Sequence, residues 1–232
     1  MKCKFFKNLT VKDNFYKRQI FNNCMIEYIL FDLSEVWIQG MVGAEKEIAK
    51  RVGATEEQVW KHLNVDALMP LFEGKISEDE YWRSVAAEGS KSGADYFVPL
   101  DFFKETMRSN FTELPGTRTV IEQLKEQGYP LGLLSDHVQE WAEDVEAKYP
   151  IRDLFDQVNW SFEIGYTKRS AKSFEYAMRR SGADPSKILF VDDNPKNLRV
   201  ATAACIQYTH HFIDAPTLEA ALQDLGVLVH SS

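Results

Sequence analysis

Short runs of consecutive apolar residues recur along the chain, separated by longer segments with helical periodicity. The run from Tyr28 to Leu33 is rich in β-branched and aromatic residues and is too short for a typical helix. Its apolar positions are consecutive, which is typical of a parallel strand buried on both faces. Comparable runs lie at 129–135, 157–160, 187–192 and 205–209. Strands that alternate with helices predict an α/β fold with a doubly wound, Rossmann-like parallel sheet and right-handed crossovers.

The segment from Trp37 to Phe111 interrupts this alternation, because it is helical in pattern and contains no convincing strand. Two capping boxes open helices within it, and Gly74 is a plausible stop between them. The boxes pair Thr55 with Gln58 and Ser77 with Glu80. A first helix is expected at 44–52 and a last helix at 100–111, with a polar break at 89–93 before the last one. We therefore predict a core domain at 25–39 and 112–232 and an inserted helical cap domain at 40–111.

Residues 1–24 differ in composition from the rest of the chain. They hold six basic residues against one acid, Asp13, with aromatic residues interleaved, and they lack the apolar centre of a signal peptide. Such a segment could contact a nucleic acid or a membrane surface. We favour an N-terminal extension that lies outside the core, with Met25 as an alternative start.

Charge and cysteine content narrow the class of protein. The formal net charge of −8 argues against broad binding to nucleic acids or anionic membranes. No apolar run approaches the roughly 20 residues that span a bilayer. The three cysteines, Cys3, Cys24 and Cys205, are widely spaced, which indicates free thiols in a reducing compartment. We expect a cytoplasmic protein, monomeric or homodimeric, that binds neither nucleic acid nor membrane.

Polar residues follow four of the apolar runs, and in a parallel sheet they would open onto one crevice. Carboxylates gathered there repel one another unless a cation neutralises them, and oxygen ligands without His or Cys select Mg²⁺. A lysine and a hydroxyl would bind a phosphate, and a carboxylate beside them can act as a nucleophile that forms an aspartyl-phosphate. The residues concerned are Asp32, Ser135, Lys168, Asp192 and Asp193.

Each of these residues also has a purely structural interpretation. Asp32 and Ser135 could be ordinary polar residues at strand ends, and Lys168 could be a solvated loop lysine with Arg169 and Lys172 close by. The sequence 192–195 is also a good helix N-cap. Asp136 and His137, just after Ser135, are interpreted as helix-start residues. We favour the metal over the cap at 192–193, because two adjacent acids exceed what capping requires.

Four motifs in this order, around a helical insert, resemble those of the haloacid dehalogenase superfamily. They are Phe31 to Val36, Leu133 to Ser135, Lys168 in the segment 165–168, and Phe190 to Asn194. The insert resembles that superfamily's helical C1-type cap, and the segments 71–77 and 114–116 resemble stretches of its phosphatase-like members. The resemblance covers about Ile26 to Leu225.

The resemblance implies a role for each motif. Asp32 would be the nucleophile, Ser135 would hydrogen-bond the transferring phosphoryl oxygens, and Lys168 would orient Asp32. Mg²⁺ would be held by Asp32, the backbone carbonyl of Ser34 and Asp193, with Asp192 beside it. The expected activity is Mg²⁺-dependent hydrolysis of a small phosphorylated metabolite through an aspartyl-phosphate.

One position departs from the pattern. Phosphatases of this superfamily usually carry a second aspartate two residues after the nucleophile, as general acid and base, and here that residue is Ser34. Losing positioned acid–base catalysis costs ~10²–10⁴ in rate. The alternative is therefore a catalytically weak phosphate-binding or regulatory protein. Halide or phosphonate chemistry ranks below both. Arg169, where proline is common after the lysine, is a second departure.

Overall fold

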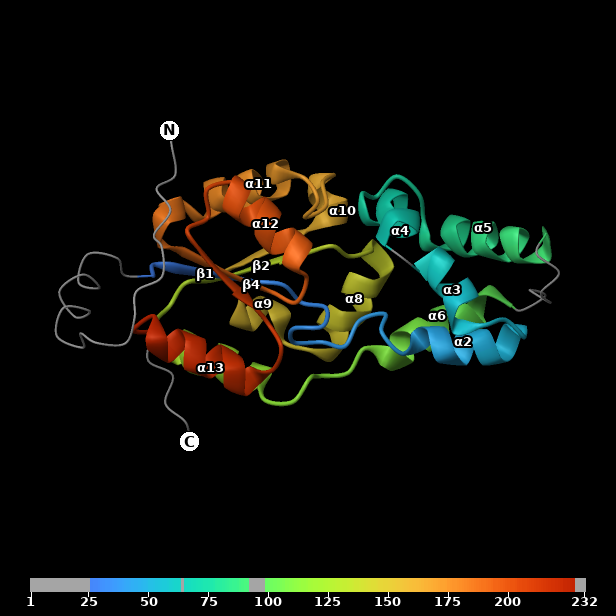
Figure 1. The fold of residues 1–232 in the computed structure, drawn as a ribbon, viewed down its shortest axis with the longest axis horizontal. Coiled ribbons are helices and arrows are strands. Elements are labelled where there is room, and N and C mark those ends of the chain that lie inside the picture. The colour runs from blue at the N-terminus through green and yellow to red at the C-terminus, as the bar shows by residue number, and fades with distance from the viewer. Residues whose placement is uncertain (1–25, 64, 92–98, 228–232) are drawn as a thin grey trace.

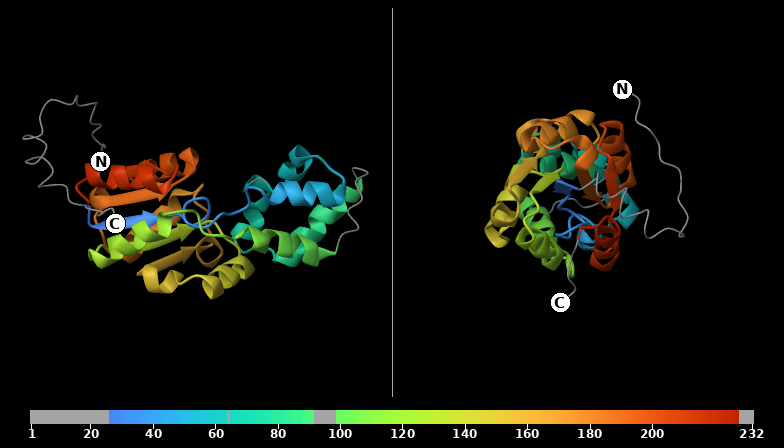
Figure 2. Two further views of the ribbon diagram at one scale, coloured as in Figure 1. Left: turned by 90° about the horizontal axis from the view of Figure 1, so that it is seen from below. Right: turned by 90° about the vertical axis from the view of Figure 1, so that its left-hand side faces the viewer.

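The computed structural model describes residues 26–63, 65–91 and 99–227. The predicted N-terminal extension therefore lies outside the described residues. Figures 1 and 2 show two lobes, an α/β core and a helical cap, joined where the core strands end. Among the described residues, no helix is long and apolar enough to cross a membrane.

The core is built on five parallel strands in the order β3-β2-β1-β4-β5. The first strand, β1, lies at the centre, with β2 and β4 paired on either side. This arrangement confirms the predicted doubly wound sheet. The strands are β1 (Tyr28–Phe31), β2 (Leu131–Ser135), β3 (Gln157–Trp160), β4 (Ile188–Asp192) and β5 (Tyr208–His211).

Side-chain alternation along β1 supplies both faces of the sheet. Tyr28 and Leu30 pack with Phe174 in one apolar cluster, whereas Ile29 and Phe31 belong to the other cluster. Because both faces are buried, a continuous apolar run specifies the strand. One face is covered by α11 (Ala171–Ser181) and α12 (Pro195–Ala203), and the other by α7 (Thr117–Glu126), α9 (Ile151–Leu154) and α13 (Ala215–Asp224).

The cap follows β1 in the chain and consists of helices. Both expected capping boxes are formed: Thr55 and Gln58 exchange hydrogen bonds, as do Ser77 and Glu80. Gly74 has a positive φ of 68°, as a helix stop requires. The cap helices are α2 (Ala44–Val52), α3 (Glu56–Leu63), α4 (Val65–Phe72), α5 (Glu78–Lys91) and α6 (Leu100–Asn110).

Several details differ from the sequence prediction. Helix α5 continues to Lys91, through the start of the expected polar break at 89–93. The last strand begins at Tyr208, because Cys205 turns the chain with a positive φ of 74°. Helix α4, which contains Pro70, was not predicted, nor were the four-residue core helices α9 and α10 (Ser161–Ile164), which are too short to show a helical pattern.

Core helix α8 (Gln139–Lys148) lies where the two lobes meet (Figure 1). Phe111, the residue that follows the last cap helix, packs edge-on against the adjoining His137 and at a tilt against Trp141 of α8. Ser161 connects the lobes through one hydroxyl, which accepts from the His137 N–H and donates to the Phe72 carbonyl of α4 at 2.6 Å. The cap thereby contacts the core at the same edge to which the parallel strands point.

Candidate active site

Three carboxylates meet at the carboxyl edge of the sheet. Asp32 follows β1, and Asp192 ends the neighbouring strand β4, with Asp193 next in the chain. One oxygen from each of the three lies within 4.8 Å of the others. These distances follow from the parallel pairing of β1 with β4, in which Phe31 lies opposite Val191.

Lys168 is buried between two of these carboxylates. Its Nζ lies 2.5 Å from Asp32 Oδ2 and 2.7 Å from Asp192 Oδ2. The neighbouring cations point elsewhere: Lys172 stacks on the exposed Tyr166, and Arg169 lines the cavity above the site. The lysine of the third motif, and not one of its neighbours, is therefore the cation among the carboxylates.

Asp192 and Asp193 have different surroundings. Asp192 is fully buried and accepts from the Asn194 N–H at 2.8 Å and from the Asn197 side chain at 3.1 Å, in addition to Lys168. The N-cap of α12 is Asn194, whose side chain accepts from the Lys196 N–H. Since Asn194 caps the helix and Asp192 is occupied by protein donors, Asp193 is the carboxylate of this pair that lines the cavity.

Ser135 ends β2, on the other side of β1. Its side chain is completely buried, and its Oγ has no hydrogen-bond partner among the described residues. A buried hydroxyl without a partner is costly, by about 1–3 kcal/mol. Ser135 is not among the described residues that line the cavity, so a contact of this hydroxyl with a ligand stays a prediction.

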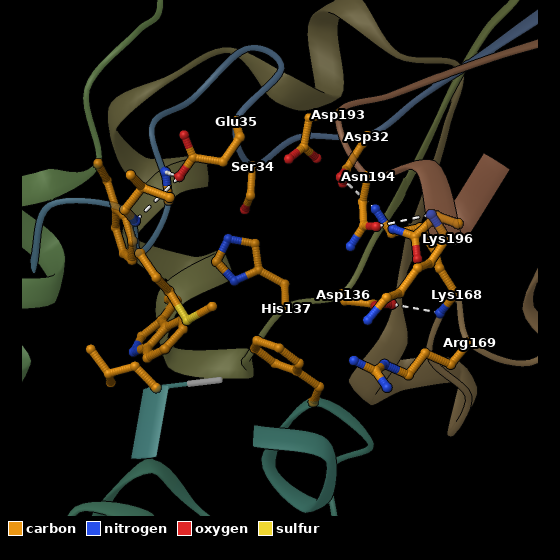
Figure 3. Close-up of a pocket in the computed structure, with 18 of the residues that line it drawn as sticks. Asp32, Ser34, Glu35, Asp136, His137, Lys168, Arg169, Asp193, Asn194 and Lys196 are labelled. Carbon is orange, nitrogen blue, oxygen red and sulfur yellow. Dashed lines mark hydrogen bonds and ion pairs between the residues drawn. The ribbon is translucent and has the colours of Figure 1, made fainter. Parts of the chain in front are cut away.

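The chain turns sharply between Asp32 and the cap. Glu35 has a positive φ of 59°, and its carboxylate accepts from the backbone N–H groups of Gly40 and Val42. Figure 3 shows the Glu35 carboxylate on the opposite side of the cavity from Lys168, whereas the Ser34 side chain points toward the His137 ring. Ser34 and Glu35 both line the cavity, but the Glu35 carboxylate is held by the backbone of Gly40 and Val42.

A cavity of about 440 Å³ lies above the carboxylates. The sheet edge lines one end with charged side chains, among them Asp32, Lys168 and Asp193. The other end is apolar and aromatic, with residues from cap, linkers and core. Those residues are Met41, Val42, Trp60, Leu63, Phe72, Phe111 and Trp141.

Asp136 and His137 also line this cavity, which corrects their interpretation as helix-start residues. Helix α8 begins at Gln139 with Val138 as N-cap, so both residues lie in the loop before it. Asp136 accepts from the Lys168 N–H at 2.8 Å, and His137 Nδ1 accepts from the Val138 N–H at 3.1 Å. The only sequence signal for them was their position after a strand-end motif.

Burial and mutual repulsion shift the acids of the site. Burial raises the pKa of Asp32 well above its usual range; Lys168 opposes this rise, and Asp192 and Asp193 add to it. Burial likewise raises the pKa of Asp193 to about 6, and that of Asp136 to about 6. Burial by itself lowers the pKa of Lys168, but Asp192, Asp32 and Asp136 outweigh it and the net shift is upward.

The donor set fits Mg²⁺. The three clustered carboxylates with the one ammonium of Lys168 among them leave an excess of negative charge, which a further cation would neutralise. The ligand atoms are all oxygens, the preference of a hard cation that retains waters. Asp32 and Asp193, with the nearby Ser34 backbone, are the groups that would hold it.

Comparison with known proteins agrees with this geometry. The chain is 31% identical over 185 residues to a glyceraldehyde 3-phosphate phosphatase of Pyrococcus abyssi, covering 73% of this chain and 74% of the relative. It is 25% identical over 192 residues to a D-ribitol-5-phosphate phosphatase of Bacteroides thetaiotaomicron, covering 76% and 87%. A flavin mononucleotide hydrolase of Arabidopsis thaliana is 24% identical, covering 67% and 60%.

Solved structures share the fold. A HAD-like family hydrolase from Porphyromonas gingivalis superposes with a TM-score of 0.69 at 22% identity, covering 87% of this chain and 98% of that one. A HAD family enzyme from Bacteroides thetaiotaomicron, in complex with magnesium and inorganic phosphate, gives a TM-score of 0.63 at 21% identity, covering 80% and 93%. The family model of haloacid dehalogenase-like hydrolases matches residues 18–204. The chain therefore belongs to the haloacid dehalogenase-like hydrolases.

Proposed function

We propose that this chain is a Mg²⁺-dependent phosphatase that hydrolyses a small phosphorylated metabolite through an aspartyl-phosphate. The observation that carries the proposal is the convergence of Asp32, Asp192 and Asp193 within 4.8 Å, with Lys168 among them, beneath a cavity. Two of the three relatives described above are named as phosphatases of small phosphorylated metabolites, and the third is named as a flavin mononucleotide hydrolase.

Asp32 is the nucleophile in this proposal. Its Oδ1 accepts from the Leu33 N–H at 2.7 Å and its Oδ2 pairs with Lys168, so the carboxylate is fixed in orientation. An oxygen of Asp32 forms a bond to phosphorus as the ester P–O bond breaks, and the electron pair of that bond leaves with the ester oxygen. Water then attacks the phosphorus and releases phosphate and the Asp32 carboxylate.

The other residues bind and neutralise the phosphoryl group. Lys168, buried and protonated, offsets charge on Asp32 and on the transferring group, and the Ser135 hydroxyl donates to a phosphoryl oxygen. Asp192 forms an ion pair with Lys168 and accepts a hydrogen bond from the Asn197 side chain, and so positions the lysine. Bound Mg²⁺ would add positive charge and orient the phosphate at Asp32 and Asp193.

Ser34 favours a second candidate function. No carboxyl occupies its place, so a site that binds phosphate with little turnover is the competing proposal. The two proposals predict different results when the hydrolysis of phosphate esters with Mg²⁺ is measured for wild type, Asp32→Asn and Ser34→Asp. Hydrolysis by wild type that Asp32→Asn abolishes supports the phosphatase. An inactive wild type that gains activity in Ser34→Asp supports the binding protein instead.

A further inference from the structure

The cavity has two chemically different ends, and the far end bears on the substrate. If Asp32 attacks phosphorus in line, the leaving group lies opposite Asp32, toward the cap. There the cavity is lined by Trp60 and Leu63 of α3, by Phe72 of α4 and by Phe111. None of the described side chains that the cap helices contribute to this lining is charged.

A polyol leaving group would bind weakly at this end of the cavity. Each hydroxyl that moves from water to an apolar wall without a new hydrogen bond costs free energy. A planar ring, in contrast, gains free energy by packing against aromatic faces. Trp60 is half-buried, so part of its ring surface remains available to a ligand. The wall therefore favours a ring-bearing leaving group.

The acids near the leaving group form the second, independent observation. Figure 3 shows the Asp136 carboxyl turned toward Lys168, where it accepts the lysine N–H. Glu35 is bound to the backbone of Gly40 and Val42. Asp32 is the nucleophile and Asp193 is a metal ligand in the proposed function. Asp136 and Glu35 are thus each held by backbone N–H groups through one carboxylate oxygen, and the position two residues after Asp32 offers the hydroxyl of Ser34 in place of a carboxyl.

His137 does not fill this role either. Phe111, Trp141 and Trp160 pack edge-on around its ring, with centroids 5.2–6.0 Å away. Burial lowers the pKa of His137 to about 3, so the ring is neutral near pH 7. Because Nδ1 accepts the Val138 N–H, the ring proton is on Nε2. A neutral imidazole can donate a hydrogen bond to a leaving oxygen but is a very weak acid.

We infer that the substrate is an aryl phosphate, a monoester whose leaving group is a ring-bearing phenol that departs as the phenolate. This inference rests on the proposed function. A phenol has a pKa of about 10, as a tyrosine side chain does. A phenolate therefore leaves without prior protonation far more readily than an alkoxide. The phosphorus–oxygen bond breaks toward the phenolate, which takes a proton from water after release.

Four probe substrates separate the ring from the leaving oxygen. Phenyl phosphate has both features, benzyl phosphate has the ring with an alcohol oxygen, acetyl phosphate has a good leaving group without a ring, and glyceraldehyde 3-phosphate has neither. We expect kcat/KM with Mg²⁺ to be at least about 100-fold higher for phenyl than for benzyl phosphate, the scale of a missing general acid. Benzyl or glyceraldehyde phosphate hydrolysed as fast as phenyl phosphate would overturn the inference while leaving the phosphatase intact. If none of the four probes is hydrolysed, the proposed function itself is overturned.

Two variants test the observations one at a time. Ser34→Asp restores a carboxyl beside Asp32 and should raise kcat/KM for benzyl phosphate relative to phenyl phosphate; an unchanged ratio contradicts the missing-acid argument. Trp60→Leu should raise KM for phenyl phosphate about 5- to 10-fold, and should raise KM for acetyl phosphate by a smaller factor. Glu57→Ala, exposed on the same helix α3, is the matched control. Equal effects of Trp60→Leu on both substrates would contradict the aromatic wall.

Discussion

The indole nitrogen of Trp141, on core helix α8, donates a 2.8 Å hydrogen bond to the carboxylate of Glu78, on cap helix α5. The same oxygen accepts from Trp82 at 3.1 Å, and Arg108 of α6 binds both carboxylate oxygens at 2.9 Å. Glu78 is 1% exposed. One buried carboxylate therefore holds two cap helices to the core helix that borders the cavity.

Replacing Glu78 should destabilise the protein. Glu78→Ala leaves two indole N–H groups and the Arg108 guanidinium without their acceptor, and we expect a loss of about 2–4 kcal/mol in the free energy of unfolding. Glu78→Gln retains an acceptor and should lose less. Urea denaturation measures both. Asp79→Asn, which removes the ion-pair partner of Arg83 and Lys104 on the same helix, should change stability much less; an equal loss there would contradict the special role of Glu78.

The contribution of Glu78 should depend on pH. Burial alone raises the pKa of this carboxyl, but the hydrogen bonds from Arg108, Trp141 and Trp82 outweigh it, so the pKa is lowered on folding. A carboxyl with a lowered folded pKa stabilises fully above its unfolded pKa and loses that contribution as pH falls through the folded value. The stability difference between wild type and Glu78→Gln should thus shrink from about pH 6 to about pH 3. A difference that grows toward acid would reverse this sign.

The sheet and its acids were predictable because both depend on local sequence. A strand buried on two faces needs consecutive apolar residues, as in Tyr28–Phe31, and parallel strands bring their ends to one edge. That is sufficient to gather Asp32, Asp192 and Asp193 without knowing any long-range contact. The roles assigned to these residues remain predictions that the experiments above test.

The contacts between the lobes were not predictable in this way. Glu78 stands in the first turn after a capping box, a position usually exposed, and its partner Trp141 comes 63 residues later. Asp136 and His137 face the cavity only because α8 begins two residues after His137. Their exposure depends on how the cap closes over the core, and no periodicity in either segment encodes that packing.

Lys168 is expected to stabilise the fold as well as the reaction. Lys168→Met leaves Asp32 and Asp192 buried without their cation, which we expect to cost about 3–5 kcal/mol in the free energy of unfolding. The loss should be smaller with Mg²⁺ present, because the ion replaces part of the missing charge. Unfolding curves with Mg²⁺ and with a chelator measure this. Lys172→Met, an exposed lysine near by, is the control, and a loss that Mg²⁺ does not reduce would contradict a metal beside Asp32.

Magnesium should raise the melting temperature through Asp193. A ligand at 100 times its Kd stabilises the folded state by about 2.7 kcal/mol. Asp193→Asn should abolish that Mg²⁺-dependent rise, whereas Asp153→Asn, which changes an exposed acid of α9, should retain it.

Without Mg²⁺ the effect of Asp193→Asn on the melting temperature has the opposite sign. Folding raises the pKa of Asp193 to about 6, so the charge of Asp193 destabilises the folded state above that pH. Asp193→Asn should therefore melt at a higher temperature than wild type. Thermal scans with and without Mg²⁺ near pH 7 test both signs, and an unchanged rise in Asp193→Asn would place the ion elsewhere.

Ser135→Ala should separate stability from activity. The Ser135 hydroxyl is buried at the end of β2 without a partner, so removing it eliminates an unsatisfied polar atom and should leave the free energy of unfolding unchanged or raise it by up to about 1 kcal/mol. If that hydroxyl binds the transferring phosphoryl group, kcat should nevertheless fall about 100- to 1000-fold, the range seen when one such donor is removed. Ser173→Ala supplies the contrast, since that buried hydroxyl donates to the Ser170 carbonyl, and its loss should lower stability without affecting kcat. A Ser135→Ala variant that keeps full activity would show that the hydroxyl has no part in phosphoryl transfer.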